Sequence, residues 1–360
     1  MQNTSIRYGR RVLPSVLLIS NQTSTARCPG VVAALQELSA SSEIGDVSVI
    51  HAGVGREPAG IRAERVVREV RASSADILLV LSLKDAVSDM PGMARAIAGR
   101  PVLYWEGDPW GSGKRVSDAM HAWMELSAIV FSVGGEPQSG LLRRVGAGDV
   151  RLIVHTYDHV LFAEAERSFD WGAPSASAGF VGSNLMRAPL ISGLPGSWQR
   201  FTLVRRVRNS LPGFAVAGPG WPPGWSQGAI PFADQVPFLR SCRLLTNWDH
   251  YPATRDYTSD RLAITMIAGR AQVSTLHPGM AWIPAEDQGV FTEATVTAAV
   301  DRTIELAALP DATLRDLGES AHAWARFRMS HRNAYRYMLS SLVDSVAAPT
   351  QEPWNRLPTP

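Results

Sequence analysis

Short apolar runs alternate with amphipathic stretches through the first half of the chain. The apolar runs occupy residues 15–20, 47–51, 75–81, 102–105, 128–133 and 150–154. Between them, apolar positions recur at helical spacing in residues 30–38, 61–71, 91–98 and 117–126, and a short helix is expected near Leu141. Buried strands separated by helices are typical of a parallel sheet with helices on both faces. The first half is therefore predicted to be a doubly wound α/β domain.

A second series of strands and helices follows a polar segment, residues 169–178, that contains proline and glycine. Strands are expected at residues 179–182, 214–218, 244–245 and 272–275, and helices at 198–210, 231–239, 261–268, 298–308, 312–328 and 331–346. The polar segment is the best candidate for an interdomain linker, which divides the chain into a domain of residues 1–170 and one of residues 178–328. The proline-rich residues 347–360 are expected to be disordered.

The loops that follow strands are the most informative about function, because ligands of doubly wound domains bind beyond the carboxyl ends of the strands. The densest such loop in the first half is the sequence WEGDPWG, in which Glu106 and Asp108 lie between Trp105 and Trp110. Flat aromatic faces suit the C–H faces of sugars, so these residues predict an acceptor site. Asp108 is a candidate general base, or a group that positions an acceptor hydroxyl. The alternative is a tight Gly-Asp-Pro turn in which Asp108 caps local backbone.

Two histidines also end strands of the first half. His155 follows residues 150–154 and is a candidate catalytic donor or base, with a purely structural role as the alternative. His51 begins a glycine-containing turn that either approaches an acceptor or simply reverses the chain. The loop of residues 21–25 lacks the G-x-G-x-x-G pattern of a dinucleotide site. This absence argues against a dehydrogenase.

Residues 241–276 arrange a strand, a polar loop, a helix, a glycine and a second strand in that order. Ser259 and Asp260 are candidate caps for the helix, which points unpaired N–H groups and its positive dipole end into the loop. Arg261 adds a forked, permanently charged donor at the same place. The combination predicts a phosphate site. The alternative is a surface arginine that pairs with Asp260 or Asp256.

Six segments of the second half carry a resemblance to a known family. They are residues 180–183 (FVGS), 214–218 (FAVAG), 257–261 (YTSDR), the helix end at Ala268 and Gly269, residues 272–275 (QVST) and residues 277–279 (HPG). Together they resemble the donor half of a GT-B glycosyltransferase, and most closely the spore-maturation CgeB-like group and its retaining relatives. The resemblance runs from Gly179 to the helix near Met338, whereas the first half matches only in general layout.

The resemblance implies an α/β fold with two Rossmann-like doubly wound domains that face a cleft. The first domain would bind the acceptor and the second the nucleotide sugar, and residues 329–346 would form a C-terminal helix that crosses back to the first domain. It also implies a nucleotide diphosphate sugar as co-substrate, with no cofactor and no metal.

On the same resemblance, the donor-binding residues are Gly182, Ser183, Arg187, Gly218, Asn247, Asp256, Tyr257, Ser259, Asp260 and Arg261. The chain departs from the family pattern in two places. Retaining relatives carry glutamates at the positions of Asp256 and Ile264, and the second glutamate holds the ribose. Isoleucine cannot do so, and Asp260 is a candidate substitute. Ser183 replaces the usual arginine of the first glycine turn, while Arg187 lies next to the position of the usual lysine.

The composition is that of a globular protein, with 45% hydrophobic and 19% charged residues. The formal net charge of +2 comes from scattered arginines, which suits a small anionic ligand and argues against a nucleic-acid partner. The four arginines of residues 198–210 cannot share one helix face, so most of them are expected to be solvated.

Cys28 and Cys242 have no metal-ligand spacing around them and are expected to be reduced thiols. The apolar residues 12–19 follow three arginines as in a signal peptide, but Pro14 and Ser15 interrupt them, and a first strand fits better. The sequence holds no apolar segment long enough to span a bilayer. A cytoplasmic location is therefore expected.

The leading hypothesis is a glycosyltransferase that moves a sugar from a nucleotide diphosphate donor to a small-molecule acceptor. A nucleotide-sugar epimerase on the same fold would share the donor site but would need two acid-base groups and no acceptor pocket. A noncatalytic sugar-binding protein of the periplasmic-binder class would also pair two α/β domains. Such a protein normally carries an export signal or a DNA-binding headpiece, and neither is visible in the sequence.

Overall fold

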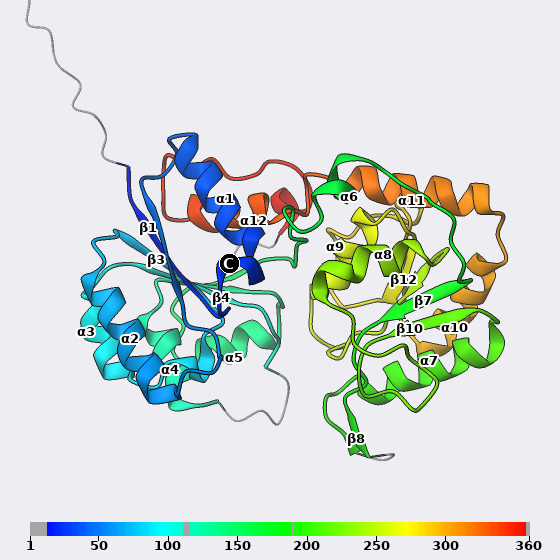
Figure 1. The fold of residues 1–360 in the computed structure, drawn as a ribbon, viewed down its shortest axis with the longest axis horizontal. Coiled ribbons are helices and arrows are strands. Elements are labelled where there is room, and N and C mark those ends of the chain that lie inside the picture. Colours follow the sequence, from blue (N-terminus) through cyan, green and yellow to red (C-terminus); the bar gives the residue numbers. More distant parts are fainter. Residues whose placement is uncertain (1–12, 111–115, 189–190, 358–360) are drawn as a thin grey trace, which may run out of the picture.

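The computed structural model describes residues 13–110, 116–188 and 191–357, which form two α/β domains side by side (Figure 1). The sheet of the first domain is six-stranded and parallel, in the order β2, β1, β3, β4, β5, β6. Its strands are β1 (Val16–Ser20), β2 (Val47–His51), β3 (Ile77–Leu81), β4 (Val102–Glu106), β5 (Ile129–Ser132) and β6 (Val150–Leu152). Every residue of β1 and β3 is buried, because their continuous apolar runs face helices on both sides of the sheet.

Helices cover both faces of this sheet. The helices of the first half are α1 (Pro29–Ala40), α2 (Ala59–Ala72), α3 (Met90–Ile97), α4 (Asp118–Leu126) and α5 (Gln138–Arg144), and the short α6 (Ala163–Arg167) that follows them lies beside α11 (Asp311–Ala325) (Figure 1). Helices α2, α3 and α4 lie on one face and α1 on the other (Figure 1). The predicted doubly wound architecture of the first domain is confirmed.

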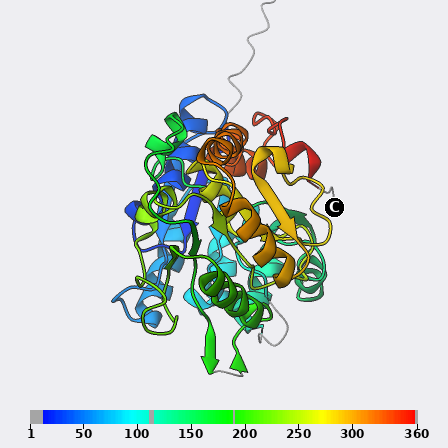
Figure 2. The same cartoon turned by 90° about the vertical axis from the view of Figure 1, so that its right-hand side faces the viewer.

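The second domain has a five-stranded parallel sheet in the order β10, β7, β11, β12, β13. Its strands are β7 (Ala178–Val181), β10 (Phe214–Ala217), β11 (Leu245–Thr246), β12 (Gln272–Thr275) and β13 (Val290–Glu293). Its helices are α7 (Ser197–Ser210), α8 (Gln235–Arg240), α9 (Asp260–Ile267), α10 (Val296–Ala307) and α11 (Asp311–Ala325). Strand β13 was not predicted from the sequence, nor was the two-stranded hairpin of β8 (Met186–Ala188) and β9 (Ile191–Ser192). This hairpin projects from the domain (Figure 2).

The last helix, α12 (His331–Ser340), returns to the first domain and packs beside α1 (Figure 1). Its Arg332 forms an ion pair with Glu37 of α1 at 2.8 Å. Arg336 donates from Nη2 to Glu43 at 2.7 Å. The helix ends at Ser340, several residues before the end expected from the sequence. The C-terminal part of the chain thus leaves the second domain and covers the first.

The expectation of a disordered tail is wrong for residues 347–357. Trp354 is only 3% exposed, its ring contacts Tyr337 of α12 at 5.4 Å between centroids, and its indole N–H donates to the carbonyl of Arg328 at 2.8 Å. Leu357 is buried as well. Proline content suggested disorder, but two large apolar side chains in this segment have a surface to pack on.

Replacing Trp354 with alanine is expected to lower the free energy of unfolding by about 3 kcal/mol, because a buried indole is lost and a cavity remains. Urea denaturation followed by circular dichroism measures the change. Leu342→Ala is a matched control, since Leu342 is 38% exposed and its truncation should change stability by less than about 1 kcal/mol. Stability equal to that of the wild type in Trp354→Ala would mean that the tail does not pack on α12.

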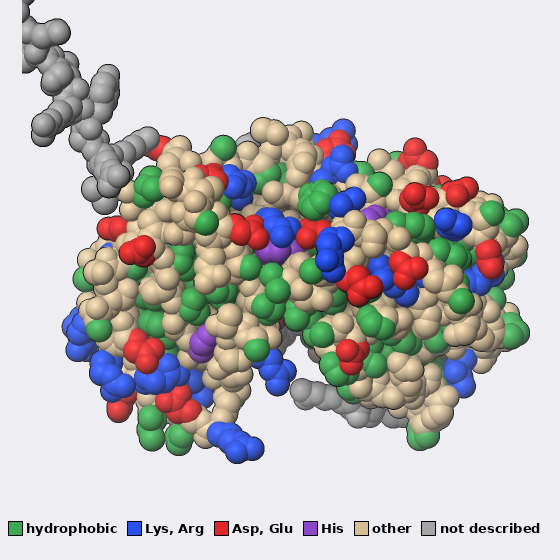
Figure 3. Space-filling view, turned by 45° about the horizontal axis from the view of Figure 1, so that its top comes forward, with side chains coloured by type: hydrophobic (Ala, Val, Ile, Leu, Met, Phe, Trp, Pro, Cys, Tyr) green, Lys and Arg blue, Asp and Glu red, His purple; other side chains and the backbone are tan. Residues whose placement is uncertain are grey.

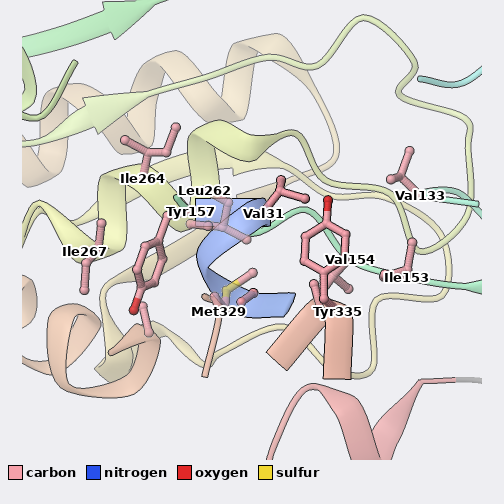
Figure 4. Close-up of a cluster of buried hydrophobic side chains, with 14 of the residues drawn as sticks. Val31, Val133, Ile153, Val154, Tyr157, Leu262, Ile264, Ile267, Met329 and Tyr335 are labelled. Carbon is pink, nitrogen blue, oxygen red and sulfur yellow. The ribbon is translucent and has the colours of Figure 1, made fainter. Parts of the chain in front are cut away.

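One hydrophobic core runs through both domains. It includes Val31 of α1, Tyr157 after β6, Ile264 of α9 and Met329 before α12 (Figure 4). Two backbone bonds join the segments at this junction, from Tyr157 N–H to the Met329 carbonyl at 2.8 Å and from His331 N–H to the Tyr157 carbonyl at 3.1 Å. The domains are therefore in contact through packed side chains and backbone, besides their covalent connections.

Candidate functional site

A cavity of about 650 Å³ lies between the two domains, where the surface is indented (Figure 3). Trp105, Asp108 and His155 line it from the first domain, and Phe232 and Asp260 line it from the second. Of the sequence-predicted site residues, the cavity thus brings together Trp105, both catalytic candidates and one donor-binding candidate. The carboxyl ends of β4 and β6 and the start of α9 position these side chains.

Arg261 is at the start of α9 and reaches back to the end of β7. Its Nε donates to the carbonyl of Val181 at 2.6 Å. A side chain on Gly182 would lie 3.1 Å from this Nε, and a side chain on Gly218 would collide with the Gly182 carbonyl. Both glycines have positive φ, so only glycine fits both turns without strain. The structure therefore gathers three of the predicted donor-binding residues in one place.

The surface alternative for Arg261 does not match its contacts. Among the described residues, no ion pair joins Arg261 to Asp260 or Asp256, and the arginine is only partly exposed. Ser259 has the extended backbone of an N-cap, but its hydroxyl makes no capping bond. The Ser259 side chain thus caps none of the first N–H groups of α9, although its carbonyl accepts from Leu262 N–H at 3.2 Å.

Arg200 is a charged residue of the site that the sequence analysis missed. It was expected to be one of several solvated arginines of α7, whereas it is only 1% exposed. Its Nε donates to the Trp248 carbonyl at 2.6 Å, and its Nη1 donates to His250 Nε2 at 2.6 Å and to the Ser183 carbonyl at 3.4 Å. Burial, aided by the nearby charge of Arg261, lowers the pKa of Arg200 to about 9. Burial and Arg200 likewise lower the pKa of His250 to about 3, which keeps its imidazole neutral.

Asp249, in the loop between β11 and α9, forms a buried pair with His277. This pair was also not predicted from the sequence. Asp249 Oδ2 accepts from His277 Nε2 at 3.1 Å, and Oδ1 accepts from Asn247 at 2.9 Å. Burial by itself would raise the pKa of Asp249, but the hydrogen bond and charge of His277 and the charge of Arg200 hold it well below its usual range. His277 Nδ1 faces the Thr254 carbonyl at 3.1 Å. Both ring nitrogens of His277 thus have an oxygen within hydrogen-bond distance.

Asp256 and Tyr257 extend from this loop toward the first domain. Asp256 has a left-handed φ of 55° and a buried carboxyl, and burial raises its pKa. The ring of Tyr257 contacts His277 at 5.4 Å and His155 at 6.2 Å between centroids. His155 also meets the ring of Trp105 at 6.1 Å. Aromatic contacts therefore connect the predicted acceptor side of the cavity with the predicted donor side.

Asp108 forms an ion pair that the sequence did not reveal. Its Oδ2 is 2.7 Å from the ammonium of Lys84, which is also 3.3 Å from Glu106. Asp108 is 70% exposed, whereas Glu106 is fully buried and burial raises its pKa. Burial lowers the pKa of His155, which leaves a neutral imidazole near pH 7.

Three of the predicted acceptor residues are not placed to contact a sugar. Trp110 is only 2% exposed and belongs to the core of the first domain, so its ring cannot stack on a ligand. Glu106 is enclosed beside Lys84, as described above. His51 ends the edge strand β2, is within 3.2 Å of the Thr25 hydroxyl, and does not line the cavity. Of the four acceptor candidates, Trp105 lines the cavity.

The remaining donor-binding candidates lie in different surroundings. Ser183 contributes its carbonyl to Arg200, and the Asn247 side chain supports Asp249. Arg187 belongs to β8, but its side chain lies outside the described ones. Ile264, at the position of the ribose glutamate, is fully buried in the core shared by the domains (Figure 4). Asp260, its candidate substitute, does line the cavity.

Over residues 13–110, 116–188 and 191–357, no cluster of three or more His, Cys, Asp or Glu side chains is placed to bind a metal ion. None of the helices in the same ranges has the length and apolar character needed to cross a membrane.

No protein-family model and no curated protein matches the sequence. Solved structures match its fold over nearly its whole length. HepE of Anabaena, in complex with UDP and glucose, is 12% identical over 92% of this chain and 100% of its own, with a TM-score of 0.60. Sucrose-phosphate synthase of Thermosynechococcus elongatus is 12% identical over 91% and 100%, with a TM-score of 0.58. An alpha-glucosyltransferase in complex with UDP and a 13-mer DNA is 9% identical over 93% and 100%, with a TM-score of 0.64. The likeness concerns the fold, and the chain has the two-domain GT-B fold of these glycosyltransferases.

Proposed function

We propose that the protein is a glycosyltransferase that moves a sugar from a nucleotide diphosphate sugar to a small-molecule acceptor. The observation that carries the proposal is Arg261, which lies at the start of α9 against the glycine turns of Gly182 and Gly218. Its neighbour Asp260 lines the interdomain cavity. Arginine and helix N–H groups at this point would stabilise the departing diphosphate, so neither a metal nor a cofactor is needed. The solved structures with UDP or UDP-glucose on the same fold support this class of donor.

The acceptor would enter from the first domain. A cavity of about 650 Å³ suits a small molecule, and the exposed part of Trp105 offers a stacking face for a sugar ring. Asp108, held by Lys84, would position the acceptor hydroxyl, and the neutral His155 would accept its proton as the acceptor oxygen bonds to the anomeric carbon. From the sequence resemblance we further propose that the protein is related to the CgeB-like group and that transfer retains the configuration of the anomeric carbon.

The same proposal assigns residues 1–170 to acceptor binding and residues 178–328 to donor binding. A cytoplasmic location is supported by Cys28 and Cys242, which are both free and buried. The mild net charge of +2 supports a small-molecule acceptor rather than nucleic acid.

Thermal unfolding in the presence of UDP, GDP, TDP or ADP tests the donor site. A nucleotide at about 100 times its dissociation constant should stabilise the wild type by about 2.7 kcal/mol, and Arg261→Ala should lose most of this response. Arg68→Ala is the matched control, because Arg68 is an exposed arginine of α2 and is far from Arg261 along the sequence. This variant should respond like the wild type.

The outcome separates the possible functions. Stabilisation of the wild type that Arg261→Ala retains would show that Arg261 is not a phosphate ligand. Turnover of UDP-glucose to a second nucleotide sugar without any acceptor would favour an epimerase. A lack of response to all four nucleotides would overturn the proposed donor site.

A further inference from the structure

Two loops from different domains are joined by backbone hydrogen bonds at the edge of the site. The N–H of Gly135, in the loop after β5, donates to the carbonyl of Arg255 at 2.8 Å. The N–H of Arg255 donates back to the carbonyl of Glu136, also at 2.8 Å. Arg255 belongs to the loop that precedes α9. The two domains thus pair as two short strands would, without using a side chain.

The pairing depends on the absence of side chains at Gly134 and Gly135, here termed the diglycine turn. A Cβ on Gly134 would lie 2.5 Å from Cγ2 of Thr254, a contact that the structure cannot hold. A Cβ on Gly135 would lie 3.3 Å from Arg255 and from the carboxyl of Asp256. Neither glycine has a positive φ, so the turn requires glycine for space rather than for backbone conformation.

The loop that the diglycine turn contacts is the one that presents Asp256 and Tyr257. The hydrogen bonds that hold this loop from its own domain include one from Asp256 N–H to the Pro278 carbonyl at 2.8 Å and one between His277 and the Thr254 carbonyl at 3.1 Å. From the other domain, only Gly135 of the diglycine turn and the adjacent Glu136 reach its backbone among the described hydrogen bonds. The loop is therefore clamped between the two domains, directly before the first turn of α9.

We propose that the diglycine turn is a positioning element for sugar transfer, which sets Asp256 and Tyr257 against the donor sugar when the domains are together. The inference rests on the proposed function. The proposed diphosphate ligands, Arg261 and the turns of Gly182 and Gly218, all belong to the second domain and do not touch the diglycine turn. Loss of the pairing should therefore slow transfer and leave nucleotide affinity nearly unchanged.

The test enlarges the side chain at Gly134 of the first domain and reduces the one that it meets, Thr254 of the second domain. Gly134→Ala introduces the Cβ that collides with Thr254, and Thr254→Ser removes the methyl group that it meets while keeping the hydroxyl. The double variant should restore the pairing. Gly148→Ala is the matched control, because a Cβ at this position of the first domain has no heavy atom within 4 Å. The measurements are UDP affinity by calorimetry and UDP release from UDP-glucose with water as the acceptor.

The expected kcat of Gly134→Ala is about 100-fold below that of the wild type, since small misplacements of reacting groups have effects of this size. Its Kd for UDP should stay within about twofold of the wild-type value, and the double variant should recover most of the lost rate. Gly148→Ala should match the wild type in both measurements.

Two results would overturn the inference alone. One is an unchanged kcat in Gly134→Ala, and the other is a parallel loss of UDP affinity, kcat and melting temperature that the double variant does not recover, which would indicate a purely structural turn. A wild-type protein that binds UDP and shows either result leaves the proposed function intact. A wild type that binds no nucleotide would overturn the proposed function and this inference with it.

Discussion

Replacing Arg270 with methionine is expected to lower the free energy of unfolding by about 4 kcal/mol. Arg270 is 0% exposed, and no carboxylate of the described residues forms an ion pair with it. Instead it donates to five carbonyl oxygens, those of Asp170, Trp171, Arg240, Cys242 and Gly269. Its guanidinium also lies 4.4 Å from the ring of Trp171. Methionine fills a similar volume but leaves these carbonyls without donors in the protein interior.

Urea denaturation at neutral pH measures this effect, and Arg68→Met provides the control for loss of an exposed arginine. The control should change stability by less than about 0.5 kcal/mol. Arg270→Lys keeps the charge but lacks the forked donor, so it should remain well below the wild type. A change of less than 1 kcal/mol in Arg270→Met would mean that the carbonyls find other partners. Because Asp170 and Trp171 belong to the segment between the domains, the same variant should loosen that segment.

Asp249→Asn is expected to lower the free energy of unfolding at pH 7 by about 3–5 kcal/mol, because it removes a buried carboxylate that accepts from Asn247, contacts His277 and offsets the charge of Arg200. The variant should also change the pH dependence of stability. The pKa of Asp249 is lower in the folded protein than in the unfolded chain, so its contribution is fully present above the unfolded pKa. The contribution is lost as the pH falls through about 4 toward the folded pKa.

Urea unfolding of the wild type and Asp249→Asn between pH 3.5 and 7 measures both effects. Wild-type stability should fall on acidification more steeply than that of the variant, so the two curves should approach each other at low pH. Asp301→Asn replaces an exposed aspartate of α10 and should run parallel to the wild type. Parallel curves for Asp249→Asn and the wild type would contradict the ionised pair.

The sheets could be predicted because their strands are continuous apolar runs that end in polar or glycine-containing loops, as β1 and β3 show. Strand β13 was missed, because its sequence VFTE mixes two apolar with two polar residues and resembles a loop. The same α/β pattern located the carboxyl-end loops correctly, and with them Trp105, Asp108, His155 and Asp260.

The buried charges of the site could be predicted only in part. Arg200 falls on the same helical stripe as Leu203, Val204 and Val207, so its spacing contained the signal of burial that its charge obscured. No local pattern indicates that Asp249 meets His277, because the pair forms only when β11 and β12 become neighbours in the sheet. The contact between Lys84 and Asp108 likewise depends on the adjacency of β3 and β4.

The chain passes between the domains twice, once from α6 to β7 and once from α11 to α12. With two covalent tethers, one domain cannot tumble freely relative to the other, and the motion left to it is rotation about the line that joins the tethers. Such a hinge keeps the diglycine turn and the loop of Arg255 facing each other even when they separate. Little conformational entropy then opposes closure, because a two-tether hinge has few open states to lose.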